Sequence, residues 1–287
     1  MLSLFDGISV AQLALKELNI PVNYYASEID KNCIKLTQHH FPNTIQLGNV
    51  CDIDGTTLPN IDLMVFGSPC QSLSSLNRAS RTTGLDSEDS GLFYEALRIL
   101  KEVEPKFYIM ENVKSMPTKD RNIISDLLGV KPIEINSNLV SCSNRSRLYW
   151  TNIPNVVAPE DKNISLQDYI EDGFFDRKFS NAILTKNIPY TKAGLIRYLK
   201  RSIGQVVFHD KSFAELPKKE KLKRIYPMPL EEVKSLYRLF TVQELEQCQT
   251  LPIGYVSDIL KKTPATHAIG NSFTKDVISH ILSFANF

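Results

Sequence analysis

The chain has 287 residues, of which 43% are hydrophobic and 23% are charged, and its formal net charge at pH 7 is +1. This length suffices for one large hydrophobic core, or for one core with a smaller appended domain. No segment approaches the roughly 20 consecutive apolar residues of a membrane span, and no secretory signal is recognisable at the N-terminus. We therefore expect a cytoplasmic protein without a membrane-spanning segment.

The first half of the chain alternates short apolar runs with segments of helical spacing. Strands are predicted at residues 1–5, 22–27, 44–47, 62–67 and 107–110, and helices at residues 8–18, 30–41 and 91–104. Strands that alternate with helices form a mostly parallel sheet covered on both faces. The predicted fold class is therefore α/β.

The sequence changes character after residue 154, where polar, lysine-rich sequence extends to about residue 237. Residues 177–238 contain 15 Lys and Arg residues against 5 Asp and Glu residues, a local net charge of +10. Such a segment suits contact with a polyanion such as a nucleic-acid backbone, although an ordinary solvated face has the same composition. Helices are expected again at residues 240–249 and 272–284, separated by a turn at residues 251–254.

The five cysteines are odd in number and widely spaced, and no two of them form a C-x-x-C pair. A disulfide framework and a zinc site both require closer or paired spacing. We therefore expect free thiols in a reducing compartment and no bound metal.

Chemically useful residues follow each predicted strand of the first half. They are, in chain order, Gly7, Glu28, Asn49, Cys70 and Glu111. The carboxyl ends of parallel strands meet at one edge of the sheet, where ligands bind. An acidic residue after the second strand can accept hydrogen bonds from a ribose, and a glycine after the first lets a ligand approach the backbone. The pattern indicates a nucleoside cofactor, whereas the absence of G-x-G-x-x-G and of a P-loop argues against a dinucleotide or a phosphate-cradling loop.

Cys70 comes directly after an apolar strand, next to Pro69 and before the polar segment 71–90. A lone cysteine is more often a small buried hydrophobic residue than a nucleophile. The position of Glu111 after the neighbouring strand favours the nucleophile.

Six motifs occur in a fixed order along the chain. They are Leu4-Phe5-Asp6-Gly7-Ile8, Ser68-Pro69-Cys70-Gln71, Glu111-Asn112-Val113, Arg145-Ser146-Arg147, residues 238–241 with 250–252, and residues 268–272. In order and spacing this set resembles the cytosine-5 DNA methyltransferase family, including compact bacterial and phage enzymes of restriction-modification type and, in its first motif, the animal de novo enzymes. The resemblance implies a Rossmann-like catalytic domain at residues 1–154, a smaller target-recognition domain at 155–235, and a return to the catalytic domain at 236–287.

The resemblance also implies a reaction, the methylation of cytosine C5 in double-stranded DNA with S-adenosylmethionine as methyl donor. Cys70 would add to C6 of a cytosine flipped out of the helix, which makes C5 nucleophilic. Glu111 would bind N3 of the base and favour this addition, and Arg145 and Arg147 would hold the base and the catalytic loop. The base that removes the C5 proton is not identified by the sequence.

For the cofactor, the resemblance places Phe5 near the adenine, Glu28 at the ribose hydroxyls, and Asn271 with Ser272 near the methionine portion. The complete implied set is Phe5, Asp6, Gly7, Ile8, Glu28, Ile29, Asn49, Val50, Pro69, Asn271 and Ser272. Asn49 stands where the family often has an Asp that accepts from the adenine amino group, which predicts slightly weaker binding. Ser143 stands where the family usually has Gln, so the sequence does not say how the catalytic loop is supported in this chain.

Two other functions share these motifs. One branch of the family modifies cytosine in transfer RNA with the same cysteine and glutamate, and a catalytically inactive DNA-binding relative would keep the fold. An amino-methyltransferase is not expected, because the sequence lacks a [DNS]-P-P-[YFW] motif after the fourth strand. A monomer is favoured, and the recognition sequence cannot be derived from loops of unknown geometry.

Overall fold

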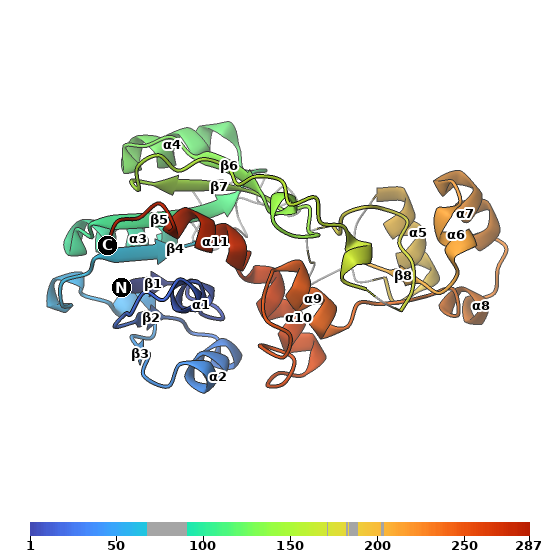
Figure 1. The fold of residues 1–287 in the computed structure, drawn as a ribbon, viewed down its shortest axis with the longest axis horizontal. Coiled ribbons are helices and arrows are strands. Elements are labelled where there is room, and N and C mark those ends of the chain that lie inside the picture. The colour runs from blue at the N-terminus through green and yellow to red at the C-terminus, as the bar shows by residue number, and fades with distance from the viewer. Residues whose placement is uncertain (68–90, 171, 182, 184–188, 202–203) are drawn as a thin grey trace. The chain divides into compact units, whose positions relative to one another are not determined.

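The computed structural model describes residues 1–67, 91–170, 172–181, 183, 189–201 and 204–287 (Figure 1). The chain divides into two compact units. Unit 1 comprises Met1–Asn136, Ser146–Pro159 and Lys275–Phe287, and unit 2 comprises Ser137–Arg145 and Glu160–Thr274.

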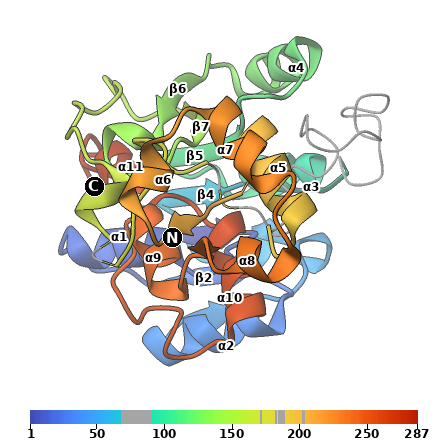
Figure 2. The ribbon, with the colours of Figure 1, turned by 90° about the vertical axis from the view of Figure 1, so that its right-hand side faces the viewer.

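Unit 1 is built on one large sheet. Its strands are β1 (Leu2–Leu4), β2 (Tyr25–Ser27), β3 (Ile45–Gln46), β4 (Leu63–Phe66), β5 (Phe107–Val113), β6 (Ile133–Asn136) and β7 (Ser146–Thr151). They form a seven-stranded sheet in the order β3-β2-β1-β4-β5-β7-β6, which can be followed from bottom to top in Figure 1, and Figure 2 shows β2, β4, β5, β7 and β6 of this sheet from another side. Within this sheet β7 runs antiparallel to both of its neighbours, and the other pairs are parallel. The prediction of an α/β fold with a mostly parallel sheet is confirmed.

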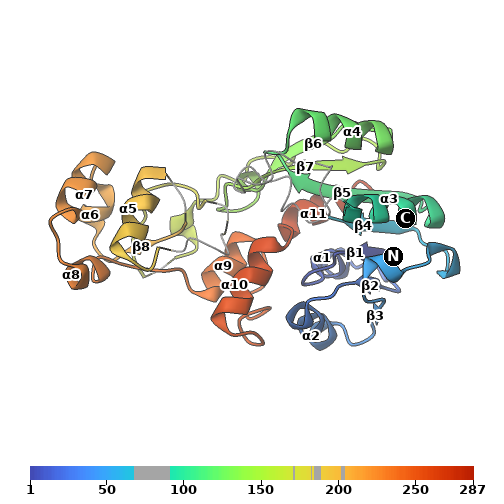
Figure 3. The same ribbon diagram turned by 180° about the vertical axis from the view of Figure 1, so that it is seen from behind.

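Helices cover the sheet of unit 1. They are α1 (Val10–Glu17), α2 (Lys31–His40), α3 (Gly91–Val103), α4 (Thr118–Leu128) and α11 (Lys275–Leu282). A continuous core joins Phe93 of α3 and Ile124 of α4 to strand residues such as Leu4, Phe66 and Trp150. The helices α1 and α11 pack against each other, although they lie at opposite ends of the chain (Figure 3). All four residues of β4 are buried, as expected for a central strand covered on both faces.

The predicted strands and helices of the first half are present, with small differences at their ends. The structure adds α4, β6 and β7, which the sequence pattern did not predict. β5 also extends three residues beyond the predicted end at residue 110, because Glu111, Asn112 and Val113 continue to pair with β7. The polar residues Glu111 and Asn112 follow the apolar run, so the sequence pattern did not predict this extension. Only the pairing with β7 shows it.

Unit 2 is mainly helical. Its elements are α5 (Lys192–Arg201), β8 (Val207–Phe208), α6 (Lys211–Glu215), α7 (Lys218–Ile225), α8 (Leu230–Lys234), β9 (Tyr237–Arg238), α9 (Val242–Cys248) and α10 (Lys262–Asn271). β8 and β9 form a small antiparallel ladder, and α5 to α8 lie around it (Figure 3). Leu195, Tyr198, Phe208 and Ile225 belong to the core of this part.

In the last third of the chain the helix predicted at residues 240–249 is present as α9, whereas the second predicted helix and the domain range differ. Residues 270 and 271 were expected to precede a helix at 272–284, whereas they end α10, and α11 begins only at Lys275. Of the range 236–287, only residues 275–287 lie in unit 1. The rest lies in unit 2, where Gln249 donates to the Ile269 carbonyl at 3.2 Å and accepts from the Thr274 hydroxyl at 2.6 Å, and the Thr274 hydroxyl lies 2.7 Å from that of Ser137. The division into catalytic and target-recognition domains stays a functional prediction.

Candidate functional site

The loop between β1 and α1 has an unusual backbone. Phe5, Gly7 and Ser9 have φ angles of 54°, 59° and 54°, in the left-handed region. A non-glycine residue in this region costs roughly 1–2 kcal/mol, so two such residues in one short loop need compensating contacts. At Gly7 a Cβ would have no heavy atom within 4 Å, so the backbone there faces open space that a ligand can enter.

A buried carboxyl supplies the compensating contacts. The Asp6 side chain accepts hydrogen bonds from the hydroxyls of Ser9 and Tyr24, the latter at 2.7 Å. The Ser9 hydroxyl also lies 2.9 Å from the Thr37 hydroxyl of α2. Ser9 precedes α1 but makes no side-chain cap, because its hydroxyl is used by Asp6. These contacts were not predicted, because Tyr24 is 18 residues from Asp6 in the sequence and only the packing turns the Asp6 side chain toward it.

The environment of Asp6 changes its acidity. Burial raises its pKa from the usual 3.8 to about 6, against the opposing effect of hydrogen bonds from Ser9, Tyr24 and Ser3. The nearby Glu28 carboxylate contributes to this rise. Asp6 therefore changes its charge close to physiological pH.

Glu28, the predicted ribose-binding acid, follows β2 and lies next to Gly7. Its Oε2 accepts from the Gly7 amide at 2.7 Å, and its Oε1 accepts from the amides of Ile29 and Asp30 at 2.7 and 2.8 Å. A carboxylate has about four acceptor positions. Three are occupied by backbone amides, so about one remains, on Oε2, for the hydroxyls of a ligand.

The other predicted cofactor residues of unit 1 differ in what they can offer. Ile29 is 73% exposed, which leaves a large apolar side chain at the ligand edge of the sheet. Asn49 is exposed and its Oδ1 accepts from the Cys51 amide at 3.2 Å. Ile8 and Val50 are buried, so their side chains belong to the core and only their backbone could face a ligand.

Glu111 and Arg147 are brought together by neighbouring strands. In the register of β5 and β7, Glu111 lies opposite Tyr149 and Arg147 lies opposite Val113, so the two charged residues are diagonal neighbours. Glu111 Oε1 is 2.9 Å from Arg147 Nε, and the two side chains are only 11% and 14% exposed. Among the described residues no hydrogen bond reaches this oxygen, so the contact is an ion pair whose N–H direction does not suit a hydrogen bond.

Pro69 and Cys70 lie outside the described residues, as do the rest of the Ser68-Pro69-Cys70-Gln71 motif and the segment 71–90. The described chain reaches Gly67, one residue beyond the end of β4. Phe66, the last residue of β4, pairs with Met110, which directly precedes Glu111. The strand that leads to the Cys70 motif therefore ends beside the strand that carries Glu111.

The remaining predicted residues belong to unit 2. Arg145 is buried and donates from Nη1 to the Gly270 carbonyl at 3.1 Å and from Nη2 to the Ser272 carbonyl at 2.8 Å. Asn271 is the exposed last residue of α10, and its amide lies 3.4 Å from a ring nitrogen of His267. Arg145 thus supports the segment that contains Asn271 and Ser272, a role the sequence did not indicate.

Not all of the basic residues at 177–238 are available to a polyanion. Arg177 and Lys221 form ion pairs with the buried Asp176 at 2.8 and 3.7 Å, and Arg238 pairs with Glu244 at 2.7 Å. These cations stabilise the interior of unit 2. The predicted basic surface must come from the other Lys and Arg residues of the segment.

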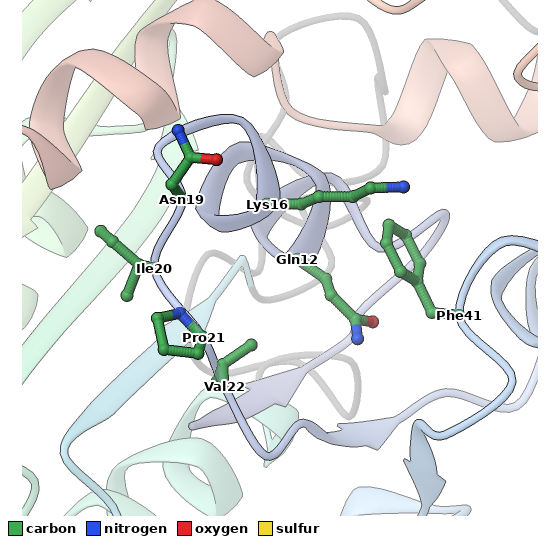
Figure 4. A pocket seen from close by; sticks show the side chains of 7 residues that line it. All are labelled: Gln12, Lys16, Asn19, Ile20, Pro21, Val22 and Phe41. Carbon is green, nitrogen blue, oxygen red and sulfur yellow. The ribbon is translucent and has the colours of Figure 1, made fainter.

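A pocket of about 450 Å³ lies elsewhere in unit 1 (Figure 4). It is lined by Gln12, Lys16, Asn19, Ile20, Pro21, Val22 and Phe41. These residues come from α1, the segment after it and the end of α2, whereas the predicted ligand loop precedes α1. None of them belongs to the predicted site.

The described part of the chain contains neither a cluster of side chains suited to a metal ion nor a helix suited to crossing a membrane. There, no group of three or more His, Cys, Asp or Glu side chains is arranged to hold a metal ion. None of the helices described has the length and apolar character needed to cross a membrane.

The N-terminal part of the chain is similar to one family of known proteins. Residues 1–130 match the family of C-5 cytosine-specific DNA methylases. The chain is 35% identical over 164 residues to an orphan methyltransferase of Bacillus phage SPR and 31% identical over 175 residues to a type II methyltransferase of Lactococcus lactis subsp. cremoris. These matches cover 52% and 58% of the chain but only 36% and 42% of the relatives, which is less than half their length.

Solved structures of methyltransferases share the fold over almost the whole chain. The methyltransferase EhMeth of Entamoeba histolytica superimposes with a TM-score of 0.72 at 15% identity, covering 99% of this chain and 96% of its own. A DNMT2 mutant of Spodoptera frugiperda superimposes with a TM-score of 0.64 at 20% identity, covering 99% and 98%. At these identities the similarity establishes the fold alone.

Proposed function

We propose that this chain methylates carbon 5 of cytosine in double-stranded DNA with S-adenosylmethionine as methyl donor. The observation that carries the proposal is the buried pair of Glu111 and Arg147 beside the end of β4, in a chain whose residues 1–130 match the family of C-5 cytosine-specific DNA methylases. A carboxyl and a guanidinium held together at this edge can bind the polar edge of a pyrimidine and compensate charge that develops on it.

The residues of unit 1 fit the proposed cofactor. The open space at Gly7 lets the cofactor approach the backbone, and the remaining acceptor position of Glu28 can contact the ribose. The exposed side chain of Ile29 offers an apolar surface for adenine. Asn49 adds an amide that can accept from the adenine amino group. When bound, S-adenosylmethionine supplies a methyl group activated by its positively charged sulfur.

In the proposed reaction the Cys70 thiolate adds to C6 of the flipped-out cytosine, forming a carbon–sulfur bond. Glu111 donates a proton or a hydrogen bond to N3, so that the electrons displaced by this addition are stabilised as C5 becomes nucleophilic. Arg147 holds Glu111 and donates to the base. C5 would then take the methyl group that S-adenosylmethionine supplies, leaving S-adenosylhomocysteine. Loss of the C5 proton to a base returns the electrons of that bond to the ring and expels the Cys70 thiolate, and a proton held at N3 returns to Glu111.

A direct test uses radiolabelled S-adenosylmethionine with mixed-sequence duplex DNA in one reaction and transfer RNA in another. The wild type should label DNA as 5-methylcytosine, and Cys70→Ser should not. Cys51→Ser is the matched control, because Cys51 is an exposed free cysteine outside the proposed chemistry. Label in RNA alone would overturn the DNA substrate, and no label in either, with cofactor binding intact, would favour an inactive binding protein.

The covalent step has its own test. Duplex DNA in which cytosine carries fluorine at C5 allows addition and methyl transfer, but it has no C5 proton to lose. The wild type and Cys51→Ser should remain attached to such DNA after denaturation, and Cys70→Ser should not. Attachment of the Cys70→Ser variant would contradict the assignment of the nucleophile.

A further inference from the structure

Five exposed cations lie on two helices of unit 2. They are Lys200 and Arg201 in the last turn of α5, and Lys218, Lys219 and Lys223 on α7. The two helices are in contact, as Figure 3 shows, and the Lys218 ammonium donates to the Lys200 carbonyl at 2.8 Å. The packing of α5 against α7 therefore brings cations from separate parts of the sequence onto one surface, which we call the α5–α7 basic face.

The positive charge of this face is not compensated within the part of the chain that the structure describes, where none of the five side chains forms an ion pair. α5 and α7 contain a single acidic residue, Glu220, and it pairs with Arg224 at 3.3 Å. Elsewhere in unit 2, Lys234 pairs with Glu231 at 2.8 Å although its side chain is 51% exposed. Exposure alone thus does not explain why the cations of the α5–α7 basic face have no acidic partner.

An uncompensated cluster of cations suits a partner with dense negative charge. Like charges held close together repel each other and destabilise the folded unit, and an anionic partner removes this repulsion. Duplex DNA presents about one negative charge per 1.7 Å of its axis, and a lysine ammonium binds a phosphate as a point charge. The exposed residues of α7 are all charged, whereas a helix that binds a lipid surface needs an exposed apolar face. The composition of the face therefore favours a nucleic-acid backbone.

An aromatic side chain adds to the same surface. The Lys200 ammonium lies 5.5 Å from the centroid of the Tyr226 ring, which directly follows α7 and is 50% exposed. A tyrosine hydroxyl can donate a hydrogen bond to a phosphate oxygen, as a lysine ammonium does. Tyr226 therefore extends the basic face with a neutral donor.

We propose that the α5–α7 basic face, with Tyr226, contacts the sugar-phosphate backbone of the DNA duplex. The inference rests on the proposed function and adds to it a surface that holds the substrate. Phosphate contacts fix the position of a protein on DNA but carry no sequence information directly. The face should therefore determine how tightly DNA is held and how binding responds to salt, and it should not determine which cytosine is methylated.

The first test measures binding of a labelled mixed-sequence duplex by fluorescence anisotropy at several salt concentrations. The test variant is Lys219→Gln/Lys223→Gln, because these two exposed side chains lie one helical turn apart on α7. Each phosphate contact contributes about 0.9 to the slope of log K against log salt, so this slope should fall by about 1.8. Either single variant should lower it by about 0.9, which keeps the test valid if the double variant does not fold.

A matched control removes the same charge outside the face. Lys211→Gln/Lys234→Gln alters two exposed lysines of unit 2 that already pair with acids, Glu215 and Glu231. Its salt slope should stay close to that of the wild type. An equal fall of the slope in both double variants would overturn the inference, because net charge and not the α5–α7 basic face would then govern binding.

The second test asks what the face does in the methylation reaction. With radiolabelled S-adenosylmethionine, Lys219→Gln/Lys223→Gln should raise the KM for DNA at least about tenfold at 0.1 M salt. Bisulfite sequencing of a long mixed-sequence duplex should find the same methylated cytosines as for the wild type. A different set of methylated cytosines would overturn the inference, since the face would then read bases.

The outcomes separate this inference from the proposed function. A wild-type salt slope in the α7 double variant, with methylation of DNA intact, overturns the surface and leaves the proposed function standing. A lower slope together with no methylation by the wild type or any variant supports the surface and overturns the proposed function. A slope that falls for transfer RNA but not for duplex DNA overturns the choice of DNA as the partner of this face.

Discussion

The ion pair between Glu111 and Arg147 leads to a specific prediction about stability. Both side chains are almost buried, at 11% and 14% exposure, and the carboxylate oxygen that faces Arg147 has no hydrogen bond. Removing one member of such a pair leaves an uncompensated buried charge and costs about 3–5 kcal/mol, whereas replacing both by apolar residues is often close to neutral. We expect Arg147→Met and Glu111→Leu each to destabilise unit 1 by about this amount, and the double variant to lose much less.

The chain offers a suitable reporter for this cycle. Trp150 is the single tryptophan, lies fully buried on β7, and donates from Nε1 to the Ser125 hydroxyl at 3.0 Å. Its fluorescence during urea unfolding therefore follows unit 1. As a control, Lys114→Met removes a cation from an ion pair with Glu134 whose side chains are 55% and 44% exposed, and it should cost no more than about 1 kcal/mol.

The reasoning would be refuted if the two single substitutions were additive. Residues that do not interact add within about 0.5 kcal/mol, so a double variant that loses the sum of the single losses would show that the pair is not coupled. A loss in the exposed control as large as that in Arg147→Met would show that burial is not the reason.

Three further predictions concern single side chains. The pKa of Asp6 is raised in the folded chain, so the contribution of Asp6 to stability is fully present below about pH 4 and is lost as the pH rises through about 6. Relative to Asp6→Asn, the wild type should therefore lose about 3 kcal/mol of unfolding free energy between pH 4 and pH 7. Urea unfolding at each pH measures this loss. Glu246 is fully buried and accepts from three backbone amides of residues 254–257 and from the Ser257 hydroxyl, so Glu246→Gln should destabilise that loop by about 2–4 kcal/mol, seen as lost amide protection in hydrogen exchange. Asn49→Asp should tighten S-adenosylmethionine binding about fivefold in calorimetry, because a charged acceptor forms a stronger hydrogen bond with the adenine amino group.

Each of these has an outcome that would contradict it. Parallel pH profiles of the wild type and Asp6→Asn would mean that Asp6 has the same acidity in the folded and unfolded chain. Unchanged exchange of the residue 254–257 amides in Glu246→Gln would mean that the carboxylate does not hold the loop. Unchanged affinity in Asn49→Asp would remove Asn49 from the adenine contact.

The sequence by itself determined those features that depend on local pattern. Apolar runs and helical spacing located five strands and three helices of unit 1, because strands and helices have characteristic periods. The positions of Gly7 and Glu28 after successive strands predicted that they would meet, and they lie in contact at 2.7 Å. Strands that alternate with helices are parallel, and their carboxyl ends lie at one edge of the sheet. The proximity of Gly7 and Glu28 therefore followed from the sequence pattern and required no knowledge of the packing.

Only the tertiary structure decided which distant side chains share an environment. Glu111 meets Arg147 because β7 inserts antiparallel beside β5 in one particular register, and Arg145, two residues earlier, belongs to unit 2 and supports Gly270 and Ser272. Asp6 was assigned to the cofactor by its motif, but packing turned its side chain toward Ser9 and Tyr24. A periodic pattern specifies which face of an element is apolar, whereas strand register and the choice of partner depend on how all the elements pack together.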